Sequence, residues 1–572
     1  MAREGSMTVA DLHACGVLEL LDVELARALG AMTEATNPDV ELAIALTSRN
    51  VRRGHACLPL NMAASDLATT AGEVAPKLPE QAPWVDALLE SALVDGGPLV
   101  LDEKRRLYLR RYWELERDIA IELGKRSTSR APDLDEPWLD KALDRLFGDD
   151  KRSPQRQAAR NALTHRVSVL CGGPGTGKTS TVAAIVAVLV EGRLQRVGPE
   201  PKVMLLAPTG KAAVRLGEAV VRAKKTIAAT GEVLANIPDE ATTVHRALGM
   251  RRHGVLFGRD ADFPIDADII VLDEASMIDL GLMRQLLVAA PVDATILIVG
   301  DPDQLTSVEA GSVLRDLVRA SDETWWSGRV TQLTKTYRYD ESQPLGQLVA
   351  AIRGGDTALM GRLLDAGDVH GHGVQWSALD DLPHELGRAA THWSEISNAT
   401  EPKEHFRRRG QYVVLSPFRK GPIGTRQLGI AIEQRLSNRD GAVRPIIIEE
   451  NNNELGVYNG DFGMLFRRDD TEVATIQREP DRFQDFAEAR LPRYSQAFAL
   501  SVHKAQGSEF DEVLIVMPEE DGPLLTRELL YTAVSRARTR VQLVGPREVI
   551  AAAIGRRAQR FSGLVDQISA VA

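Results

Sequence analysis

Apolar and polar residues follow two different spacings along this chain. Up to about residue 145 the apolar residues recur every three or four positions, which is typical of helices that bury one face. One such helix is predicted near residues 38–48, with Asn37 or Asp39 placed to cap its start. A second helix is predicted over residues 101–123. We therefore expect residues 1–145 to form a helical N-terminal domain.

The second predicted helix carries three aromatic residues and is followed by a polar stretch. Tyr108, Tyr112 and Trp113 belong to residue types that occur both in ordinary cores and at subunit interfaces, and the sequence leaves both interpretations open. Residues 126–133 have the Ser, Thr, Arg and Pro content of a linker. They are a candidate boundary between the helical domain and the rest of the chain.

Beyond about residue 150, short apolar runs rich in β-branched residues alternate with helical segments. Each run is followed at once by polar or glycine-rich residues, which is typical of buried parallel strands with ligand groups at their carboxyl ends. Four runs come first and four come much later: 167–171, 203–207, 268–272, 295–299, 412–415, 497–501, 513–516 and 541–544. The two sets predict two α/β domains with parallel sheets.

Length and composition agree with several folded domains. The chain has 572 residues and a mass of 62.4 kDa, too much for one hydrophobic core. Its 44% apolar and 26% charged residues exclude a disordered, collagen-like or coiled-coil chain. The longest apolar stretch, residues 182–190, is too short for a membrane span, and the first residues lack a signal core. With three scattered cysteines and no metal-ligand spacing, we expect a cytoplasmic protein without membrane association.

The net charge of −11 bears on partners. A protein that coats nucleic acid through its overall charge is usually basic, so that simple mode of binding is disfavoured. Local clusters such as residues 407–409 and 419–420 could still line a groove, or they could be solvated surface. The charge leaves nucleic-acid binding open.

The most specific motif is a complete phosphate-binding loop between a predicted strand and a predicted helix. Glycines let backbone N–H groups close around phosphate oxygens, and the following helix presents its positive end to them. Lys178 can reach the β- and γ-phosphates, and the Thr179 hydroxyl is placed to bind Mg²⁺. The residues expected to hold ATP in this loop are Gly172, Gly173, Pro174, Gly175, Thr176, Gly177, Lys178 and Thr179.

Acidic and amide side chains follow the next buried strands. The run 269–272 delivers Asp273, a second expected Mg²⁺ ligand, and Glu274, which can polarise the attacking water. The run 295–299 is followed by Gln304, which could bond the γ-phosphate or its water; the less favoured alternative is a simple Asp-Pro turn. Lys178, Glu274 and Gln304 are thus candidate catalytic residues.

A longer series of motifs makes the resemblance specific. In order and type the series resembles superfamily 1 helicases, and among them the RecD family, which includes the helicase subunit of the bacterial RecBCD recombination enzyme. The segments that carry the resemblance are Gln155, 207–213, 243–246, 273–279, 300–305, 337–338, 459–461, 501–509 and 531–538. The resemblance implies two RecA-like α/β domains, residues 146–337 and 338–572, with a small β-rich insert at about 429–492.

The resemblance also assigns roles to single residues. Gln155 would bond the adenine edge and Glu509 would lie near the nucleotide sugar. Arg338 and Arg536 would reach the γ-phosphate from the second α/β domain, so that hydrolysis requires both domains to close. The residues expected to touch single-stranded DNA without reading its sequence are Thr209, His245, Ser501 and His503.

The segment Gly54 to Leu60 resembles the N-terminal domain by which RecD docks on RecC. The expectation is an ATP- and Mg²⁺-dependent 5′→3′ DNA helicase subunit that acts with RecB-like and RecC-like chains on single- and double-stranded DNA at double-strand breaks. Two alternatives stay open: a stand-alone 5′→3′ helicase, and a regulatory subunit whose ATP site senses nucleotide. Intact Lys178, Glu274 and Arg536 favour hydrolysis over sensing. A transport ATPase is disfavoured by the motifs of the second α/β domain.

Overall fold

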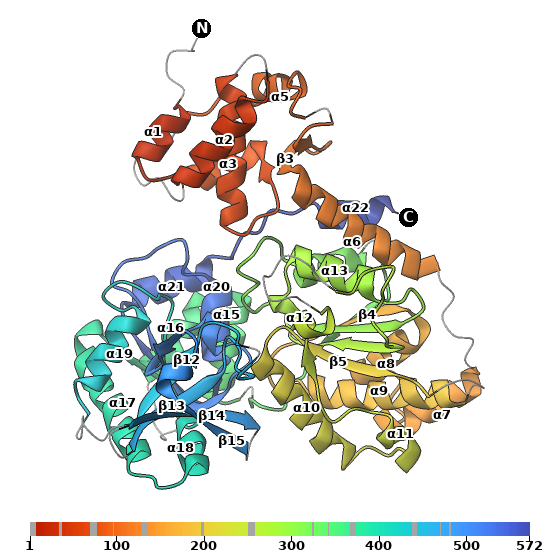
Figure 1. The fold of residues 1–572 in the computed structure, drawn as a ribbon, viewed down its shortest axis with the longest axis vertical. Coiled ribbons are helices and arrows are strands. Elements are labelled where there is room, and N and C mark those ends of the chain that lie inside the picture. The colour runs from red at the N-terminus through yellow and green to blue at the C-terminus, as the bar shows by residue number, and fades with distance from the viewer. Residues whose placement is uncertain are drawn as a thin grey trace.

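We analysed a computed structural model of the chain. It describes residues 7–33, 37–68, 77–94, 96–128, 135–195, 200–249, 258–322, 325–340, 342–366, 373–436, 443–452, 454–468, 471–479 and 482–571. Figure 1 shows an N-terminal domain standing above two α/β domains that lie side by side. Within the described residues, the helices are all too short or too polar to cross a membrane.

The N-terminal domain (residues 7–109) packs helices around a small antiparallel sheet of order β1-β3-β2. Asn37 caps α3 by accepting the N–H of Asp39 at 3.0 Å, as one of the two predicted caps. The elements are α1 Val9–Ala14, α2 Leu20–Gly30, α3 Pro38–Arg52, β1 Leu58–Pro59, α4 Ala63–Ala68, α5 Gln81–Leu89, β2 Leu99–Leu101 and β3 Arg106–Leu109. The helical character is confirmed, whereas the sheet was not predicted.

The helix predicted over residues 101–123 is wrong at its start. Residues 106–109 form β3, and α6 begins only at Arg110 and continues to Thr128. Most of the predicted linker at 126–133 lies outside the described residues, apart from its first positions at the end of α6. Tyr108 is buried in β3, while Tyr112 and Trp113 lie on α6, half-buried against the first α/β domain.

The first α/β domain contains six parallel strands in the order β6-β5-β7-β8-β4-β9. All four runs predicted for it are strands, because each is mostly apolar and largely buried on both faces. The strands are β4 Val167–Gly172, β5 Val203–Ala207, β6 Thr242–Thr243, β7 Ile269–Leu272, β8 Thr295–Gly300 and β9 Val330–Leu333. The helices are α7 Glu136–Phe147, α8 Pro154–Thr164, α9 Lys178–Leu194, α10 Gly210–Lys224, α11 Gly231–Ala235, α12 Val244–Ala247, α13 Leu280–Ala289 and α14 Val313–Arg319.

The two faces of this sheet are covered by segments that are far apart in the sequence. One face packs against α7, α8, α9 and α10. The other packs against α13 and α14 and also against α6 and the C-terminal helix α22, Leu564–Ala570. Helix α7 therefore belongs to this core although it begins before residue 145, and α6 joins the N-terminal domain to it.

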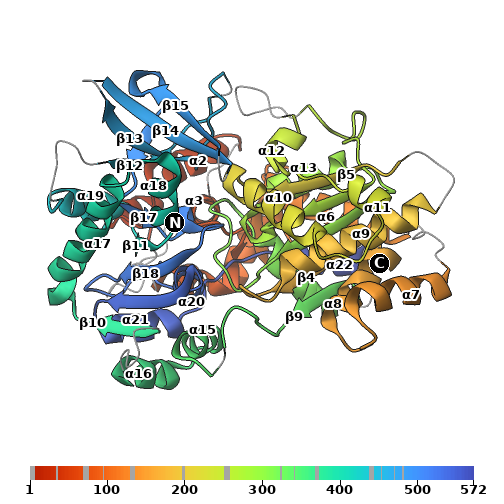
Figure 2. The ribbon, with the colours of Figure 1, turned by 90° about the horizontal axis from the view of Figure 1, so that it is seen from below.

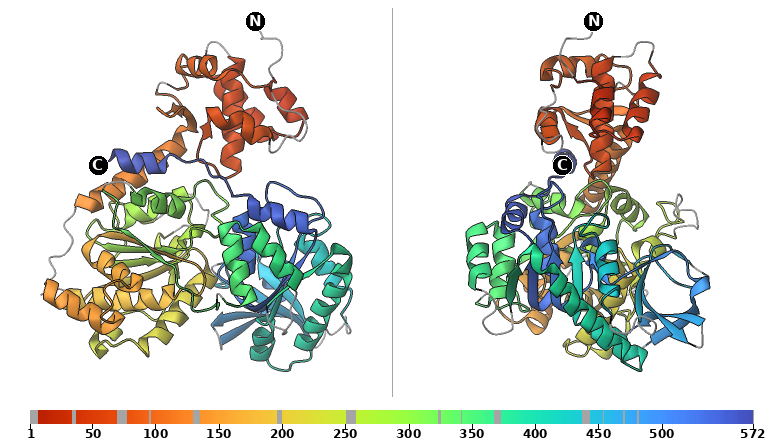
Figure 3. Two further views of the ribbon diagram at one scale, coloured as in Figure 1. Left: turned by 180° about the vertical axis from the view of Figure 1, so that it is seen from behind. Right: turned by 90° about the vertical axis from the view of Figure 1, so that its left-hand side faces the viewer.

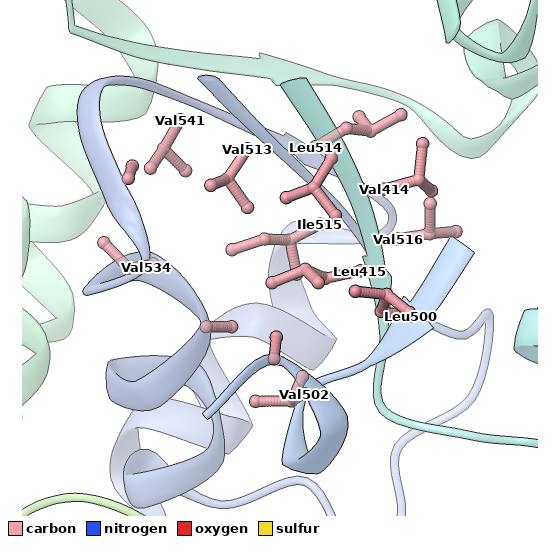
Figure 4. Packing of buried hydrophobic residues seen from close by; sticks show 14 of the residues in the cluster. Val414, Leu415, Leu500, Val502, Val513, Leu514, Ile515, Val516, Val534 and Val541 are labelled. Carbon is pink, nitrogen blue, oxygen red and sulfur yellow. The ribbon is translucent and has the colours of Figure 1, made fainter. Parts of the chain in front are cut away.

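The second α/β domain has a parallel sheet of order β10-β19-β18-β11-β17. Apolar residues of β11, β18 and β19 pack with Val534 of α20 in one core, as Figure 4 shows. The strands are β10 Val374–Ser377, β11 Tyr412–Ser416, β17 Ala499–Ser501, β18 Phe510–Val516 and β19 Ala537–Val544. The helices are α15 Pro344–Gly354, α16 Thr357–Ala366, α17 Leu382–Ser397, α18 Pro402–Arg409, α19 Thr425–Glu433, α20 Arg527–Val534 and α21 Arg547–Gly555.

The β-rich insert is a five-stranded antiparallel sheet of order β15-β14-β13-β12-β16, an open sheet with two edges. Its strands are β12 Arg444–Ile448, β13 Phe462–Arg468, β14 Thr471–Glu479, β15 Arg482–Ala487 and β16 Tyr494–Gln496. The sheet thus begins after α19 and not at the expected residue 429. Gly460 has φ +92° in a turn closed by the Asp461 N–H bonded to the Tyr458 carbonyl, so Asn459-Gly460 forms a turn before β13.

Candidate active site

The phosphate loop joins the end of β4 to the start of α9. Gly177 has φ +80° and lets the chain turn into the helix without strain. The Lys178 ammonium donates to the carbonyl oxygens of Gly172 at 2.7 Å and Gly173 at 2.9 Å. The Thr176 hydroxyl donates to the Gly173 carbonyl at 2.9 Å. Lys178 is therefore held at the loop, where phosphate oxygens can replace the carbonyls as its partners.

Two carboxylates stand at the end of β7, which is separated from β4 by β8 in the sheet. Burial first, and then the charge of Glu274, raise the pKa of Asp273 to about 6, while the Glu274 N–H bonded to Asp273 and the Lys178 charge oppose the rise. Glu274 has φ +53°, a left-handed conformation that costs a residue with a Cβ about 1–3 kcal/mol. Such strain is typical of functional sites, and here it turns the chain directly after the strand.

A third strand end, that of β8, brings a buried carboxylate next to the same lysine. Asp301 accepts the Gln304 amide N–H₂ at 2.9 Å and the Tyr531 hydroxyl at 3.1 Å, both on Oδ2. Burial raises the pKa of Asp301, and the charge of Lys178 opposes this. The Gln304 Oε1 atom is buried without a hydrogen-bond partner in the described part of the chain. A buried acceptor of this kind can take a hydrogen bond from a ligand at this place.

The loop after β8 is bonded to the second α/β domain. The Leu305 N–H donates to the Thr532 hydroxyl at 2.9 Å, and the Leu305 carbonyl accepts the Gln506 amide at 3.0 Å. The Arg353 guanidinium adds an ion pair to Asp303 at 2.8 Å. Residues 301–305 of the first α/β domain are therefore held directly against the second.

The segment around Arg338 lies directly on the phosphate loop. The Tyr337 N–H donates to the Gly175 carbonyl at 2.7 Å. A Cβ at Gly175, whose φ is +75°, would come within 2.1 Å of the Arg338 Cβ, so only glycine fits there. The Arg338 guanidinium forms an ion pair with Glu509. A cavity of about 380 Å³ opens beside this contact, lined among others by Gly173, Thr176, Thr336, Tyr339, Val349 and Tyr531.

Arg536 is 4% exposed and bonds only neutral groups. Its guanidinium donates to the carbonyls of Thr532 at 3.0 Å and Ser508 at 3.3 Å and to the Ser535 hydroxyl at 3.0 Å. Among the described residues it has no acidic partner within ion-pair distance. The Ser508 hydroxyl in turn accepts the ammonium of Lys211, which belongs to the first α/β domain. A buried, uncompensated guanidinium at a domain junction favours an anionic ligand.

Arg215 on α10 completes this cationic group, and sequence reasoning missed it. Burial lowers the pKa of Arg215. The charge of Arg536 lowers this pKa further, whereas the charges of Glu509 and Glu274 raise it. Arg215 therefore lies among predicted site residues from both domains. The sequence offered only a weak signal, because an arginine one turn into a helix is usually a surface residue.

The residues predicted to contact DNA are distributed over both domains. The Thr209 hydroxyl caps α10 by accepting the Ala212 N–H at 3.2 Å. The Ser501 hydroxyl is buried and accepts the Lys504 N–H at 3.3 Å. Burial lowers the pKa of both His245 and His503, so their imidazoles are neutral near pH 7. They are suited to hydrogen bonds and not to ion pairs with phosphates.

The insert sheet reaches the same region. The Arg246 guanidinium lies 4.8 Å from the centre of the Tyr458 ring. The Asp461 carboxylate is 3.8 Å from the place of a Cβ on Gly210 at the start of α10. Figure 2 shows the insert reaching toward α10 and α12 at the junction of the two α/β domains. Thr209 and His245 thus border a surface that both domains and the insert share.

Gln155 lies at the start of α8, half-buried, with its Oε1 accepting the Ser153 hydroxyl at 2.9 Å. Thr179 lies one residue beyond Lys178 in the first turn of α9. Within the described residues no group of three or more His, Cys, Asp or Glu side chains could hold a metal ion by itself. An ion bound by Asp273 and Thr179 would have to be completed by phosphate oxygens and water.

Three family models match the chain. An AAA domain model matches residues 155–310, a UvrD-like helicase C-terminal domain model matches residues 496–544, and the model of the N-terminal domain of RecBCD enzyme subunit RecD matches residues 14–108. The matches therefore include the region that precedes the phosphate loop.

Curated relatives decide the family. RecBCD enzyme subunit RecD of Mycobacterium tuberculosis is 36% identical, with 98% of this chain and 97% of that protein aligned. The chain belongs to the RecD family. The RecD subunit of Mycolicibacterium smegmatis is also 36% identical, over 96% of this chain and 97% of that protein. The ATP-dependent RecD2 DNA helicase of Deinococcus radiodurans is 32% identical, over 71% of this chain but only 51% of that protein.

The protein is an ATP-dependent DNA helicase of the RecBCD type. It belongs to the RecD family, has two domains with parallel sheets and carries an intact phosphate loop. The structure also explains why the site residues are so far apart in the sequence. The carboxyl ends of β4, β7 and β8 meet at one edge of the first sheet, and the second domain brings Arg338, Glu509 and Arg536 to that edge.

Proposed function

We propose that this RecD-family chain is the 5′→3′ motor subunit of a RecBCD-type enzyme, working with RecB-like and RecC-like chains on DNA at double-strand breaks. The observation that carries the proposal is how much of each relative aligns with this chain. The two mycobacterial RecD subunits align with nearly all of it, whereas the RecD2 helicase aligns over half of its own length. The two buried cysteines, Cys57 and Cys171, are free thiols that form no disulfide, which supports a cytoplasmic location.

ATP binds between the α/β domains in this proposal. The loop 172–179 holds the phosphates, Gln155 the adenine and Glu509 the sugar side of the nucleotide. Mg²⁺ fits the oxygen donors of Asp273 and Thr179, because Asp273 is a half-buried carboxylate next to Glu274 with no ion-pair partner in the described part of the chain. The bound ion would neutralise phosphate charge, as it does in other phosphate-loop enzymes.

The remaining groups carry out hydrolysis. Glu274 accepts a proton from the attacking water, and the free Gln304 Oε1 orients that water. Arg338 and Arg536 stabilise the charge that develops on the γ-phosphate. Arg338 is paired with Glu509 in this structure, so it has to exchange this partner for phosphate. The exchange links nucleotide binding to the approach of the two domains.

DNA passes over the surface bordered by α10, α12 and the insert. Thr209, His245, Ser501 and His503 bond the strand through hydroxyl and neutral imidazole groups, which do not distinguish bases. Lys211 lies beside this surface and reaches Ser508, which is next to Glu509 and bonded to Arg536. A shift of α10 would therefore change the surroundings of Arg536 through Lys211 and Ser508.

The RecC-like partner docks on the N-terminal domain in this proposal. Four large apolar side chains there are mostly exposed: Leu20 62%, Leu21 65%, Met32 68% and Leu89 59%. Exposed apolar side chains of this size are typical of interfaces. Deleting residues 1–145 is a poor test because α6 and α7 cover the first α/β sheet. Substitutions at the surface leave that cover intact.

The experiment coexpresses the full chain with its RecB-like and RecC-like proteins. The double variant Leu20→Asp, Leu21→Asp should lose copurification with the RecC-like chain while keeping ATPase activity on single-stranded DNA. Val292→Asp, at a 51% exposed apolar residue of the first α/β domain, is the matched control and should copurify normally. Unwinding of 5′-tailed but not 3′-tailed duplexes tests the polarity. A chain that binds no partner and unwinds long duplexes alone would make it a stand-alone helicase.

A further inference from the structure

The C-terminal segment ties all parts of the molecule together. After α21 it leaves the second α/β domain, runs along the first and ends in α22, which lies beside α6 in both views of Figure 3. The Arg315 guanidinium of α14 bonds the Ala558 carbonyl at 3.1 Å and the Pro302 carbonyl at 3.3 Å. Buried Glu116 of α6 accepts the Ser562 hydroxyl at 2.7 Å. The segment is thus fixed to the first α/β domain along its length.

Arg560 lies where this segment meets two other loops. One of its amino groups donates to the Arg53 carbonyl of the N-terminal domain at 2.8 Å, and the other to the Ser307 carbonyl at 3.1 Å. No carboxylate lies within ion-pair distance of Arg560 among the described residues. Burial, together with the charges of Arg315 and Arg53, lowers the pKa of Arg560 to about 10. The side chain stays charged near pH 7, so only carbonyl dipoles compensate the charge.

The N-terminal domain is shaped to receive this guanidinium. Gly54 has φ +86°, and a Cβ there would lie 1.1 Å from an Arg560 nitrogen, so any other residue would strain the backbone and displace the guanidinium. The Gly54 carbonyl accepts the Gly311 N–H at 2.9 Å. Next to it, the His55 ring stacks on Phe561 at 4.6 Å, and its Nδ1 accepts the Phe561 N–H at 3.0 Å. Residues 53–56, 307–311 and 560–561 therefore form one junction.

The junction begins three residues after Gln304, in the loop whose Leu305 is bonded to the second α/β domain. We propose that Arg560 is a positioning residue for hydrolysis, which sets the 304–311 loop through Ser307 and so makes Gln304 depend on the N-terminal domain. A guanidinium suits this task because its planar fork serves two carbonyls from different domains at once. A half-buried charge that only carbonyl groups compensate is costly, which is the reason to look for a function of Arg560.

The junction also connects the N-terminal domain to the control of ATP hydrolysis. A partner that binds the N-terminal domain and shifts residues 53–54 would also shift the Gln304 loop, and so change the rate of ATP hydrolysis. This consequence rests on the proposed docking of a RecC-like chain. The positioning role itself does not, because it can be measured on the chain without partners.

The test compares variants in single-stranded-DNA-stimulated ATP hydrolysis. Arg560→Met keeps the apolar stem but removes the donors, and kcat should fall about tenfold while KM for ATP changes less than twofold. Arg560→Lys should recover part of kcat. Gly54→Ala displaces the guanidinium without removing a charge and should reproduce the loss. Lys104→Met is the matched control, because it breaks an exposed ion pair with Asp566 of α22, 2.6 Å long, away from the junction.

Each preparation is normalised by its stoichiometry of nucleotide binding and its thermal unfolding temperature. A purely structural role would lower stability and leave kcat per nucleotide-binding molecule unchanged, and this result overturns the proposal. So does an Arg560→Met variant that matches Lys104→Met. If kcat falls as expected but the chain binds no RecC-like protein, the positioning role stands and the proposed function fails.

Discussion

The hydroxyl of Tyr531, in the second α/β domain, donates to Oδ2 of Asp301, in the first, at 3.1 Å. Both groups are buried, and burial raises the pKa of each, that of Tyr531 far above its ordinary value. The same oxygen accepts the amide of Gln304 at 2.9 Å. The Asp301 carboxylate therefore connects the orientation of Gln304 to the position of the second domain.

This geometry predicts the effect of Tyr531→Phe. The variant removes the hydroxyl alone and leaves Asp301 with one donor fewer in a buried site, a loss of about 1.5–3 kcal/mol for a bond to a charged group. We expect kcat for DNA-stimulated ATP hydrolysis to fall about tenfold, because Gln304 loses its fixed orientation. Steady-state ATPase assays at saturating single-stranded DNA measure it.

Tyr412→Phe is the control for this variant. The Tyr412 hydroxyl is also buried in the second α/β domain but has no hydrogen-bond partner in the described part of the chain. Its removal should leave kcat unchanged. Equal behaviour of the two variants would show that the bond to Asp301 has no part in hydrolysis.

The second prediction concerns the phosphate loop and the strained acid. Lys178→Ala and Glu274→Gln should each lower hydrolysis at least ~100-fold, because they remove charge stabilisation and water activation. Glu274→Gln should still bind nucleotide, since Lys178 and Asp273 remain. A fluorescent ATP analogue separates the two effects. Near-normal turnover in either variant would contradict the assignment of the site.

The third prediction separates the two possible roles of Arg536. Arg536→Ala should leave nucleotide binding intact while hydrolysis falls about 10³-fold, the range for an arginine that reaches the γ-phosphate. Arg547→Ala removes another arginine of the same domain, which pairs with exposed Asp365, and should have little effect. If Arg536→Ala lowers only the unfolding temperature, its bonds to Thr532 and Ser508 are its whole role.

The eight apolar runs predicted from the sequence are all strands of the two α/β domains because their pattern is local, whereas β6, β9 and β10 were not predicted. Buried parallel strands are continuous apolar runs, and their polar residues follow directly in the sequence. The β2–β3 hairpin escaped prediction for an equally local reason. Its turn places Arg105 at φ +59°, a conformation usually signalled by glycine or asparagine, and so β3 was read as the start of a helix.

Contacts between distant segments could not be predicted from one sequence. The motif residues around Lys178 and Asp273 come together because parallel strands end at one edge, which is a general rule. The contact of Arg560 with Ser307 joins positions 253 residues apart and follows no motif. The same holds for the pairing of Arg338 with Glu509, which depends on how the two domains meet.

The last prediction uses the buried carboxyl group of α6. Burial raises the pKa of Glu116 to about 8, with the charge of Asp316 adding to the rise and the bonds from Ser562 and Gly563 opposing it. In the folded chain Glu116 therefore stays protonated up to about pH 8, whereas in the unfolded chain it ionises above its ordinary value of 4.5. The folded state binds more protons in this window, so Glu116 makes the free energy of unfolding fall as pH rises from 4.5 to 8, by at most about 1.4 kcal/mol per pH unit.

Glu116→Gln cannot ionise, and its unfolding temperature relative to the parent chain should rise steadily from pH 5 to pH 8. Glu122→Gln should show no such trend from pH 5 to pH 8. Burial raises the pKa of Glu122, but the hydrogen bonds and charges of Lys125 and Arg126 together outweigh burial and lower it below 4.5, so Glu122 is ionised in both states throughout this window. Thermal unfolding at several pH values measures both, and parallel curves for Glu116→Gln and the parent would show that Glu116 is ionised in the folded chain.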